Sequence, residues 1–387
     1  MSERIMAHIE LINAITPIEG ADNIELAHIL GWQVVVRKSE NYQVGDKVIY
    51  VEIDSRCPAD AEWAQFLAPR HYKVKTIKLR GQLSQGLILP LSTLPKGEYE
   101  VGQDVAKILK IEKIQDDYVP PVITIEQRMK SKNPALFKKK WFQFGLRHFP
   151  WFKKLAFKWL FRNSPKETKF PTQFQFISKT DETRIQNCPA LLTCKEPMIV
   201  TEKLEGSSGT YILEQVGHNK YKFYVCSRNV CQVSAKKQCY YEDNIYWIIA
   251  NKYDIKNKMI AMLKQHPEWA YVCLQGEIIG PKICGNIYQL DDYDFYVFNF
   301  IASDWGRRGS REARDIVAAY GLKFVPILKT NYILPDTVDE MLTYAEGLST
   351  LRTTDREGVV IRSRDGTTSF KAVSNRYLLR KAKKEQE

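Results

Sequence analysis

A single lysine stands between two glutamates in the stretch IVTEKLEGSSGTYIL, residues 199–213. Lys203 in this stretch is a candidate nucleophile, because a lysine amine that has lost its proton can attack a phosphorus atom. A lysine at the end of a strand is, however, usually a solvated side chain. Other parts of the sequence must decide between these two interpretations.

Five later stretches supply the residue types that such chemistry needs. They are VCSRN with Arg228, LQGEIIG with Glu277, YVFNF with Phe298, REGVVIR with Glu357, and SFKAVS with Lys371. Phosphoryl transfer depends on positioning and on neutralisation of charge, so the two cations are candidates for phosphate contacts and Glu357 for a metal ion. Glu277 could accept hydrogen bonds from ribose hydroxyls, and Phe298 offers a face on which a base can stack.

The lysine chemistry predicts features of its surroundings. We expect burial and nearby positive charge, from Lys371 or a bound Mg²⁺, to lower the pKa of Lys203. We expect Gly206 to allow the backbone close to a nucleotide, where a Cβ atom would intrude.

The order and spacing of these motifs carry more information than any one of them. Lys203 and Glu277 are 74 residues apart, Glu277 and Glu357 80, and Glu357 and Lys371 14. Each falls at a predicted strand or strand end. In this order the stretches resemble the motifs of the covalent nucleotidyltransferases, the superfamily of polynucleotide ligases and messenger-RNA capping enzymes.

The position of the OB-like module relative to the motifs indicates one group within this superfamily. Only 16 residues follow Lys371, whereas DNA ligases and capping enzymes place an OB domain there. An OB-like module ahead of the transferase motifs resembles the ATP-dependent RNA ligases of the Deinococcus type, which seal nicks whose 3′-OH end is RNA. The stretch FPTQFQFISKTDETRIQN, residues 170–187, is also similar to that group. The resemblance covers about residues 1–115 and 170–380.

The resemblance implies a reaction through a lysyl-adenylate and an adenylated 5′-phosphate end. It implies ATP and Mg²⁺ or Mn²⁺ as cofactors, and RNA as the partner, in the form of a nicked duplex, an RNA–DNA hybrid or a structured RNA. The implied catalytic residues are Lys203, Glu357 and Lys371, with Glu357 contacting the metal. The implied nucleotide-binding residues are Glu202 through its backbone, Gly206, Arg228, Glu277, Phe298 and Lys371.

One position departs from the family pattern. Many members carry a second lysine two residues before the last one, where this chain has Ser369. Arg362 and Arg364 are the candidates to replace its phosphate contacts.

The fold class predicted is α+β. Residues 1–115 read as short strands separated by glycine-containing turns, with one helix within 59–67, which is typical of an OB-like barrel that binds nucleic acid. A β scaffold with another role remains an alternative. Residues 170–387 are predicted to form the adenylation domain, an ATP-grasp-like α+β domain with antiparallel sheets, and residues 116–169 a linking, partly helical segment.

The expected elements of the adenylation domain follow from periodicity and caps. Strands are predicted over residues 198–203, 208–214, 220–226, 270–279, 294–301, 323–328, 357–362 and 368–373. Helices are predicted over 242–265, 310–320, 337–346 and 374–384. Thr337 and Glu340 form a capping-box pattern, and Asp365-Gly366 reads as a hairpin turn.

Residues 137–162 concentrate the basic charge of the chain. They hold ten aromatic residues and eight Lys or Arg but no acid, so they account for two-thirds of the net charge of +12. Docking on a neighbouring domain with a basic outer face is the first interpretation. A nucleic-acid-binding arm is the second, and a helix lying on a membrane surface is the third.

The composition sets further bounds. The chain has no secretory signal pattern and no long apolar run, which predicts a cytoplasmic protein. We expect a monomer. The eight cysteines contain no C-x-x-C pair, so no zinc site is predicted and buried free thiols are expected.

Two alternatives to an RNA ligase stay open at this point. One is a GTP-dependent capping-type nucleotidyltransferase, against which the missing C-terminal module speaks. The other is a non-catalytic nucleic-acid-binding protein with a decayed transferase domain, against which the intact Lys203, Glu277 and Glu357 speak.

Overall fold

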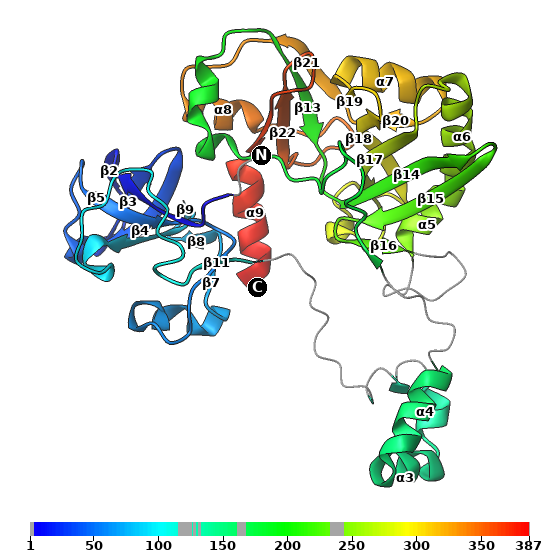
Figure 1. Cartoon of the computed structure of the whole chain (residues 1–387). Coiled ribbons are helices and arrows are strands. Elements are labelled where there is room, and N and C mark those ends of the chain that lie inside the picture. The colour runs from blue at the N-terminus through cyan, green and yellow to red at the C-terminus, as the bar shows by residue number, and fades with distance from the viewer. Residues whose placement is uncertain are drawn as a thin grey trace.

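The chain folds into two β-rich modules and a small group of helices. The computed structural model describes residues 4–114, 126, 129–130, 133–160, 168–232 and 244–386. Figure 1 shows the C-terminal helix α9 (Asn375–Gln386) between the two β-rich modules, and the helical group apart from both. Within these ranges no helix is both long and apolar enough to cross a membrane.

The N-terminal module is made of short antiparallel strands. These are β1 (Ala7–Leu11), β2 (Ala14–Pro17), β3 (Ile24–Ile29), β4 (Trp32–Arg37), β5 (Lys47–Val51), β6 (Ser55–Arg56), β7 (Lys73–Val74), β8 (Ile77–Leu79), β9 (Gln82–Ser84), β10 (Leu87–Pro90) and β11 (Glu112–Lys113). They pair as β1–β5–β10, β2–β3–β4, β11–β6–β7 and β8–β9. In β4, Trp32, Val34 and Val36 are buried and alternate with less buried residues, as expected for a strand with one face on the core.

The helix predicted within residues 59–67 is present as a 3₁₀-helix. The structure has a 3₁₀-helix, Glu62–Arg70, whose N-cap residue makes no side-chain capping bond and which contains Pro69. Proline has no N–H to donate, so an α-helical hydrogen bond is missing at this point.

The helical group forms a small core of its own. It contains α2 (Pro134–Phe137), α3 (Lys140–His148) and α4 (Pro150–Leu160). The Asn133 side chain caps α2 by accepting from the N–H of Leu136. Phe142, Leu146 and Ala156 are buried together with Met129.

The C-terminal module contains two sheets covered by helices. Its strands are β12 (Thr168–Lys169), β13 (Met198–Lys203), β14 (Ser207–Gly217), β15 (Lys220–Ser227), β16 (Val230–Gln232), β17 (Tyr271–Ile279), β18 (Asp294–Ala302), β19 (Gly306–Arg307), β20 (Lys323–Phe324), β21 (Ile327–Tyr332), β22 (Gly358–Arg362) and β23 (Ser369–Val373). Its helices besides α9 are α5 (Ile245–Lys252), α6 (Ile255–Gln265), α7 (Ser310–Ala319) and α8 (Val338–Ala345).

The two sheets are predominantly antiparallel. The larger runs β12–β16–β15–β14–β17–β18–β19, with β20 parallel to β18, and the smaller runs β21–β13–β22–β23. Helices α5, α6 and α7 share a core with the larger sheet, and α8 shares one with the smaller. The chain crosses from the smaller to the larger sheet between β13 and β14, directly after Lys203.

The prediction of one continuous helix over residues 242–265 is wrong. Residues 242–243 lie outside the described ranges, and the remainder forms two helices, α5 and α6, separated at Tyr253 and Asp254. Asp254 has a φ of 46°, in the left-handed region. A continuous helix cannot pass through such a residue.

The two β-rich modules are in direct contact. The Trp32 Nε1 donates to Asn187 Oδ1 at 2.8 Å, and Asn187 Nδ2 donates to Glu52 Oε2 at 3.0 Å. A Cβ atom on Gly31 would lie 2.4 Å from Val338 Cγ1 at the start of α8. A glycine is therefore required where the N-terminal module approaches the C-terminal one.

Candidate active site

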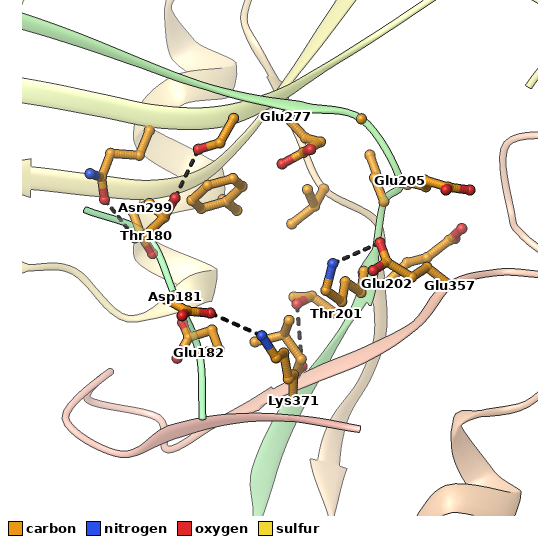
Figure 2. A pocket seen from close by; sticks show the side chains of 18 of the residues that line it. Thr180, Asp181, Glu182, Thr201, Glu202, Glu205, Glu277, Asn299, Glu357 and Lys371 are labelled. Atoms are coloured by element: carbon orange, nitrogen blue, oxygen red, sulfur yellow. Dashed lines mark hydrogen bonds and ion pairs between the residues drawn. The ribbon is translucent and has the colours of Figure 1, made fainter. Parts of the chain in front are cut away.

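A cavity of about 410 Å³ lies between the two sheets of the C-terminal module. Figure 2 shows acidic and basic side chains from several strands turned toward one another around it. All the catalytic and nucleotide-binding residues that the resemblance implied line this cavity: Glu202, Lys203, Gly206, Arg228, Glu277, Phe298, Glu357 and Lys371. Residues up to 169 positions apart are thus gathered at one place.

Lys203 is positioned by the register of β13 on β22. Residues Met198 to Glu202 of β13 are buried and Lys203 ends the strand half-buried. Lys203 pairs with Gly358, which brings it beside Glu357, the residue before Gly358. The Lys203 Nζ lies 2.7 Å from Glu357 Oε2.

The expected lowering of the Lys203 pKa is wrong. Burial alone would lower the pKa of Lys203, and Arg184 acts in the same direction. The negative charges of Glu357 and Glu277 and the hydrogen bond to Glu357 outweigh both, so the pKa is raised. Lys203 therefore carries its proton at neutral pH.

Glu277 lies in the same cavity on β17. Burial raises the pKa of Glu277 to about 8, and Glu357 adds to the rise while Lys203 opposes it. Three ionisable groups thus depend on one another here, so a change of charge on one of them alters the protonation of the others.

Gly206 is required for a packing reason that the sequence did not show, while its expected approach to a nucleotide stays a prediction. A Cβ atom at this position would lie 2.3 Å from the carbonyl oxygen of Ile278 and 2.9 Å from Glu277 Cγ. The immediate obstacle is therefore strand β17. Gly206 holds the crossover against β17 and thereby keeps Lys203 near Glu277.

A carboxylate lies between the two cations expected to bind phosphate. Lys371 Nζ is 3.0 Å from Asp181 Oδ1, and Arg228 Nη2 is 3.4 Å from Asp181 Oδ2. The N–H of Lys371 donates to the carbonyl of Thr183, which fixes this segment alongside β23. Burial lowers the pKa of Lys371, and Lys203 and Arg184 contribute, although Asp181 opposes the shift.

Of the two arginines proposed to replace the missing lysine, only Arg362 reaches the cavity. Its guanidinium lies 3.1 Å from Glu182 Oε1 and donates to Ser369 Oγ at 3.2 Å. Arg364 does not line the cavity and donates to Asn331 instead. Arg307, also at the cavity, lies 3.5 Å from Glu182.

An apolar part of the cavity suits a planar base. Leu204, Val325 and Val360 line it together with Phe298. Phe298 is half-buried and packs on the cluster of Leu204 and Val325. The ring is thus fixed in place with part of its surface open to the cavity.

Glu202 contributes to this wall through its side chain as well as its backbone. Its Oε2 accepts from the N–H and the hydroxyl of Thr350, at 2.9 and 2.7 Å. Its Oε1 is buried with no hydrogen-bond partner among the described residues. A buried carboxylate oxygen without a donor is costly, so this atom calls for a ligand that donates.

A divalent ion fits the carboxylates of the cavity only together with a ligand. No group of three or more His, Cys, Asp or Glu that could hold a metal occurs in the part of the chain that the structure describes. Mg²⁺ is usually held by one or two carboxylates, substrate phosphates and waters. Glu357 supplies such a carboxylate in the cavity, beside the cations expected to bind phosphate.

The sequence did not assign roles to several charged residues of the cavity. Asp181 and Glu182 belong to residues 170–187, the stretch that resembles the RNA ligases. That resemblance is the signal that could have identified them. Glu205, two residues after Lys203, accepts a hydrogen bond from Tyr377 of α9, and its N–H donates to Tyr288 at 2.8 Å. The contact with Tyr377 depends on the position of the last helix, for which the sequence carried no signal.

Comparisons with known proteins agree with this geometry. A family model described as RNA ligase matches residues 196–374, and one described as an OB-fold domain matches residues 6–91. A solved structure of a Naegleria gruberi RNA ligase variant with ATP and Mn is 31% identical, with a TM-score of 0.72 over 97% of this chain and 98% of that one. The same ligase with pyrophosphate is 32% identical, with a TM-score of 0.71 over 99% and 100%. A comparison with curated proteins returned no match.

The chain belongs to the RNA ligase family. The predicted fold class is confirmed: an OB-fold module precedes an α+β ligase module with antiparallel sheets. The narrower resemblance to the Deinococcus type stays a prediction, because the matched ligase structures come from Naegleria gruberi.

Proposed function

We propose that this ligase uses ATP to seal 3′-OH/5′-phosphate breaks in RNA through an adenylate on Lys203. The observation that carries the proposal is the cavity that Lys203 shares with Glu277, Glu357 and Lys371, with Lys203 in direct contact with Glu357. Family membership and the ATP, AMP and pyrophosphate complexes of the Naegleria gruberi ligase support it.

The proposed reaction has three steps. Lys203 Nζ forms a bond to the α-phosphorus of ATP, the bond to the bridging oxygen breaks, and pyrophosphate leaves with the electron pair. An oxygen of the RNA 5′-phosphate then attacks the same phosphorus and displaces the lysine. Finally the 3′-hydroxyl attacks the 5′-phosphorus of the adenylated end and AMP leaves.

Lys203 must lose its proton before the first step. Glu357 would hold a Mg²⁺ or Mn²⁺ ion, which would supply charge neutralisation at the α-phosphate. A Glu357 carboxylate engaged in this way no longer holds the ammonium of Lys203. Burial and the charge of Arg184, which both lower the pKa of Lys203, then act unopposed by that carboxylate.

The remaining residues of the cavity position the nucleotide. Lys371 and Arg228 would bind phosphate oxygens after Asp181 gives way, and Arg362 is placed to take the part of the second lysine of the family. Glu277, with its raised pKa, can also donate a hydrogen bond to the ribose. Phe298 would stack on the base.

Glu202 favours adenine over guanine. Its unpartnered Oε1 needs a donor, which the exocyclic amine of adenine provides. Guanine carries a carbonyl oxygen at the corresponding position, and two facing acceptors repel. We therefore propose that ATP is preferred to GTP, against the capping-type alternative.

We also propose the division of the chain into residues 1–115 as an OB domain, 116–169 as a linking segment and 170–387 as the adenylation domain. The two family-model matches, over residues 6–91 and 196–374, support the outer units.

The first test is covalent labelling with α-labelled ATP or GTP in the presence of Mg²⁺ or Mn²⁺. Wild type and the exposed control Lys264→Ala should take up label from ATP in preference to GTP, and Lys203→Ala should take up none. Equal labelling of Lys203→Ala would refute the proposal, and preference for GTP would favour the capping-type enzyme. Binding of nicked RNA without any labelling would favour a non-catalytic protein.

The second test concerns the nick. Duplexes that differ only in the sugar at the 3′-OH end should be sealed when that sugar is ribose and far more slowly when it is deoxyribose. Equal rates would contradict specificity for RNA ends.

A further inference from the structure

Helices α3 and α4 carry a surface that the ligase chemistry does not use. Six large apolar side chains on these helices and the turn between them are 42–63% exposed: Trp141, Phe144, Phe149, Trp151, Leu155 and Trp159. We call this set the aromatic surface. Proteins rarely leave so many large apolar groups together in water unless the patch binds something.

The aromatic surface is not left over from the core of the helical group. That core is already formed by Phe142, Leu146, Ala156 and Met129, with Phe152 packed against it. The six residues are exposed in the presence of the other described parts of the chain, so none of those parts covers them. Figure 1 shows α3 and α4 apart from both β-rich modules. The docking on a neighbouring domain that the sequence favoured is therefore absent among the described residues.

Basic side chains lie beside the aromatic surface. Residues 133–160 contain seven Lys or Arg and no Asp or Glu. On α4, Trp151, Leu155 and Trp159 follow one another at intervals of four, and the exposed Lys154 and Lys158 form a second row at the same interval. Residues four apart lie on one face of a helix, so a row of cations runs beside a row of apolar groups.

The rings of the two helices continue across the turn between them. The ring centroids of Phe144 and Phe149 are 6.2 Å apart, and those of Phe149 and Trp151 are 6.0 Å apart. The turn therefore joins the exposed rings of α3 to those of α4 in one array.

We propose that the aromatic surface and its lysines bind single-stranded RNA outside the catalytic cavity. Five of the six exposed apolar groups are aromatic, and bases stack on rings but not on aliphatic chains. Phosphates follow one side of a single strand and bases the other, which matches adjacent rows of cations and rings. The proposal rests on the proposed function only for the choice of RNA as the polyanion.

A membrane surface is the competing partner. Interfacial helices also combine Trp, Leu and Lys, but acyl chains do not require rings, and a single leucine among six residues is few for such a helix. Binding to anionic lipid is therefore the outcome that would overturn the proposal.

The test measures the binding of fluorescent oligouridine to the full-length protein by anisotropy. Trp151→Ala/Trp159→Ala should weaken binding at least tenfold, because a stacked base contributes about 1–3 kcal/mol and 1.4 kcal/mol is a factor of ten. Trp151→Phe/Trp159→Phe should restore most of the affinity. The control Trp305→Ala, which removes an 82% exposed tryptophan elsewhere, should bind like wild type.

The salt dependence separates phosphate contacts from stacking. Lys154→Ala/Lys158→Ala should reduce the slope of log K against log salt by about 1.4, since each phosphate contact contributes about 0.7 for single strands. The tryptophan variant should keep the wild-type slope. An unchanged slope in the lysine variant would contradict the assignment of these lysines to phosphates.

Two further measurements make the outcome decisive. Lysyl-adenylate formation needs no RNA, so the tryptophan variant should be labelled by ATP as fast as wild type, which also shows that it is folded. RNA affinity within twofold of wild type in a fully labelled tryptophan variant would overturn the proposal. The proposal would also be overturned if wild type sedimented with phosphatidylserine vesicles while the tryptophan variant did not sediment but still bound RNA. Failure of labelling in wild type would count against the proposed function instead.

Discussion

At the scale of single residues, the charged groups of the cavity pair with one another. Lys203 is held by Glu357, and Lys371 and Arg228 are held by Asp181. The carboxylates occupy positions where a metal-bound phosphate would bring the same negative charge. On the proposed function, nucleotide binding would exchange these internal ion pairs for contacts with phosphate.

Asp181→Asn should make ATP bind more tightly, because it removes the negative charge that competes for Lys371 and Arg228 while keeping the size of the side chain. Because the competing ion pair is charge-assisted, we expect a gain of about 1 kcal/mol in the free energy of ATP binding, which is about fivefold in Kd. Titration calorimetry on Lys203→Ala, which cannot react, measures it. The matched control is Asp336→Asn, which breaks the 2.8 Å pair with Lys195 outside the cavity. Weaker binding in Asp181→Asn would contradict this account.

The pKa of Glu277 predicts how stability depends on pH. The folded pKa, about 8, lies above the ordinary glutamate pKa of 4.5, so the folded protein holds a proton that the unfolded chain loses. This contribution to stability is complete below about pH 4.5 and is lost as the pH rises through about 8. Glu277→Gln should therefore gain stability relative to wild type by at least about 1 kcal/mol between pH 5 and 8. Denaturation with urea at several pH values measures the difference, and parallel curves for the two proteins would contradict the raised pKa.

At the scale of elements, the crossover from β13 to β14 fixes the position of Lys203, the proposed nucleophile. Gly206→Ala places a Cβ atom 2.3 Å from the carbonyl oxygen of Ile278, so β14 and β17 must separate. We expect a loss of about 2 kcal/mol in the free energy of unfolding and slower adenylate formation. Gly217→Ala at the other end of β14, where the nearest atoms are 3.8 Å away, is the matched control. Equal stability of the two variants would refute the close-packing argument.

The sequence predicted an element correctly where residues close together in the chain define it. The box formed by Thr337 and Glu340 caps α8 as predicted, and the strand that carries Lys203 has the predicted bounds. The break at Asp254 was missed because the apolar pattern continues through it. Motif order predicted which residues share the cavity, but not their pairings. The raised pKa of Lys203 depends on a register between β13 and β22 that pairs Lys203 with Gly358, 155 positions away.

At the scale of the whole molecule, Asn187 connects the OB module to the ligase module. It accepts from Trp32 Nε1 and donates to Glu52. Nearby, the Arg184 guanidinium lies 5.5 Å from the centroid of the Trp32 ring and acts on the pKa of Lys203 and Lys371. The contact between modules therefore lies close to the catalytic charges.

Asn187→Ala should weaken this contact by about 1–3 kcal/mol, because it leaves the Nε1 of the buried Trp32 without its hydrogen-bond acceptor. We expect thermal unfolding, followed by calorimetry, to broaden or divide into two transitions as the modules become less coupled. Asn331→Ala, which removes the 2.8 Å contact with Arg364 within the C-terminal module, serves as the control. A single transition at the wild-type temperature in Asn187→Ala would show that this residue does not couple the modules.

The central claim is that the cavity activates Lys203 for attack on ATP. Peptide mapping by mass spectrometry, after incubation of the full chain with ATP and Mg²⁺, tests it most directly. The account predicts one AMP group, on the peptide that contains Lys203, and its near-absence from Glu357→Ala. AMP attached to another residue, or adenylation of Glu357→Ala at the wild-type rate, would contradict it.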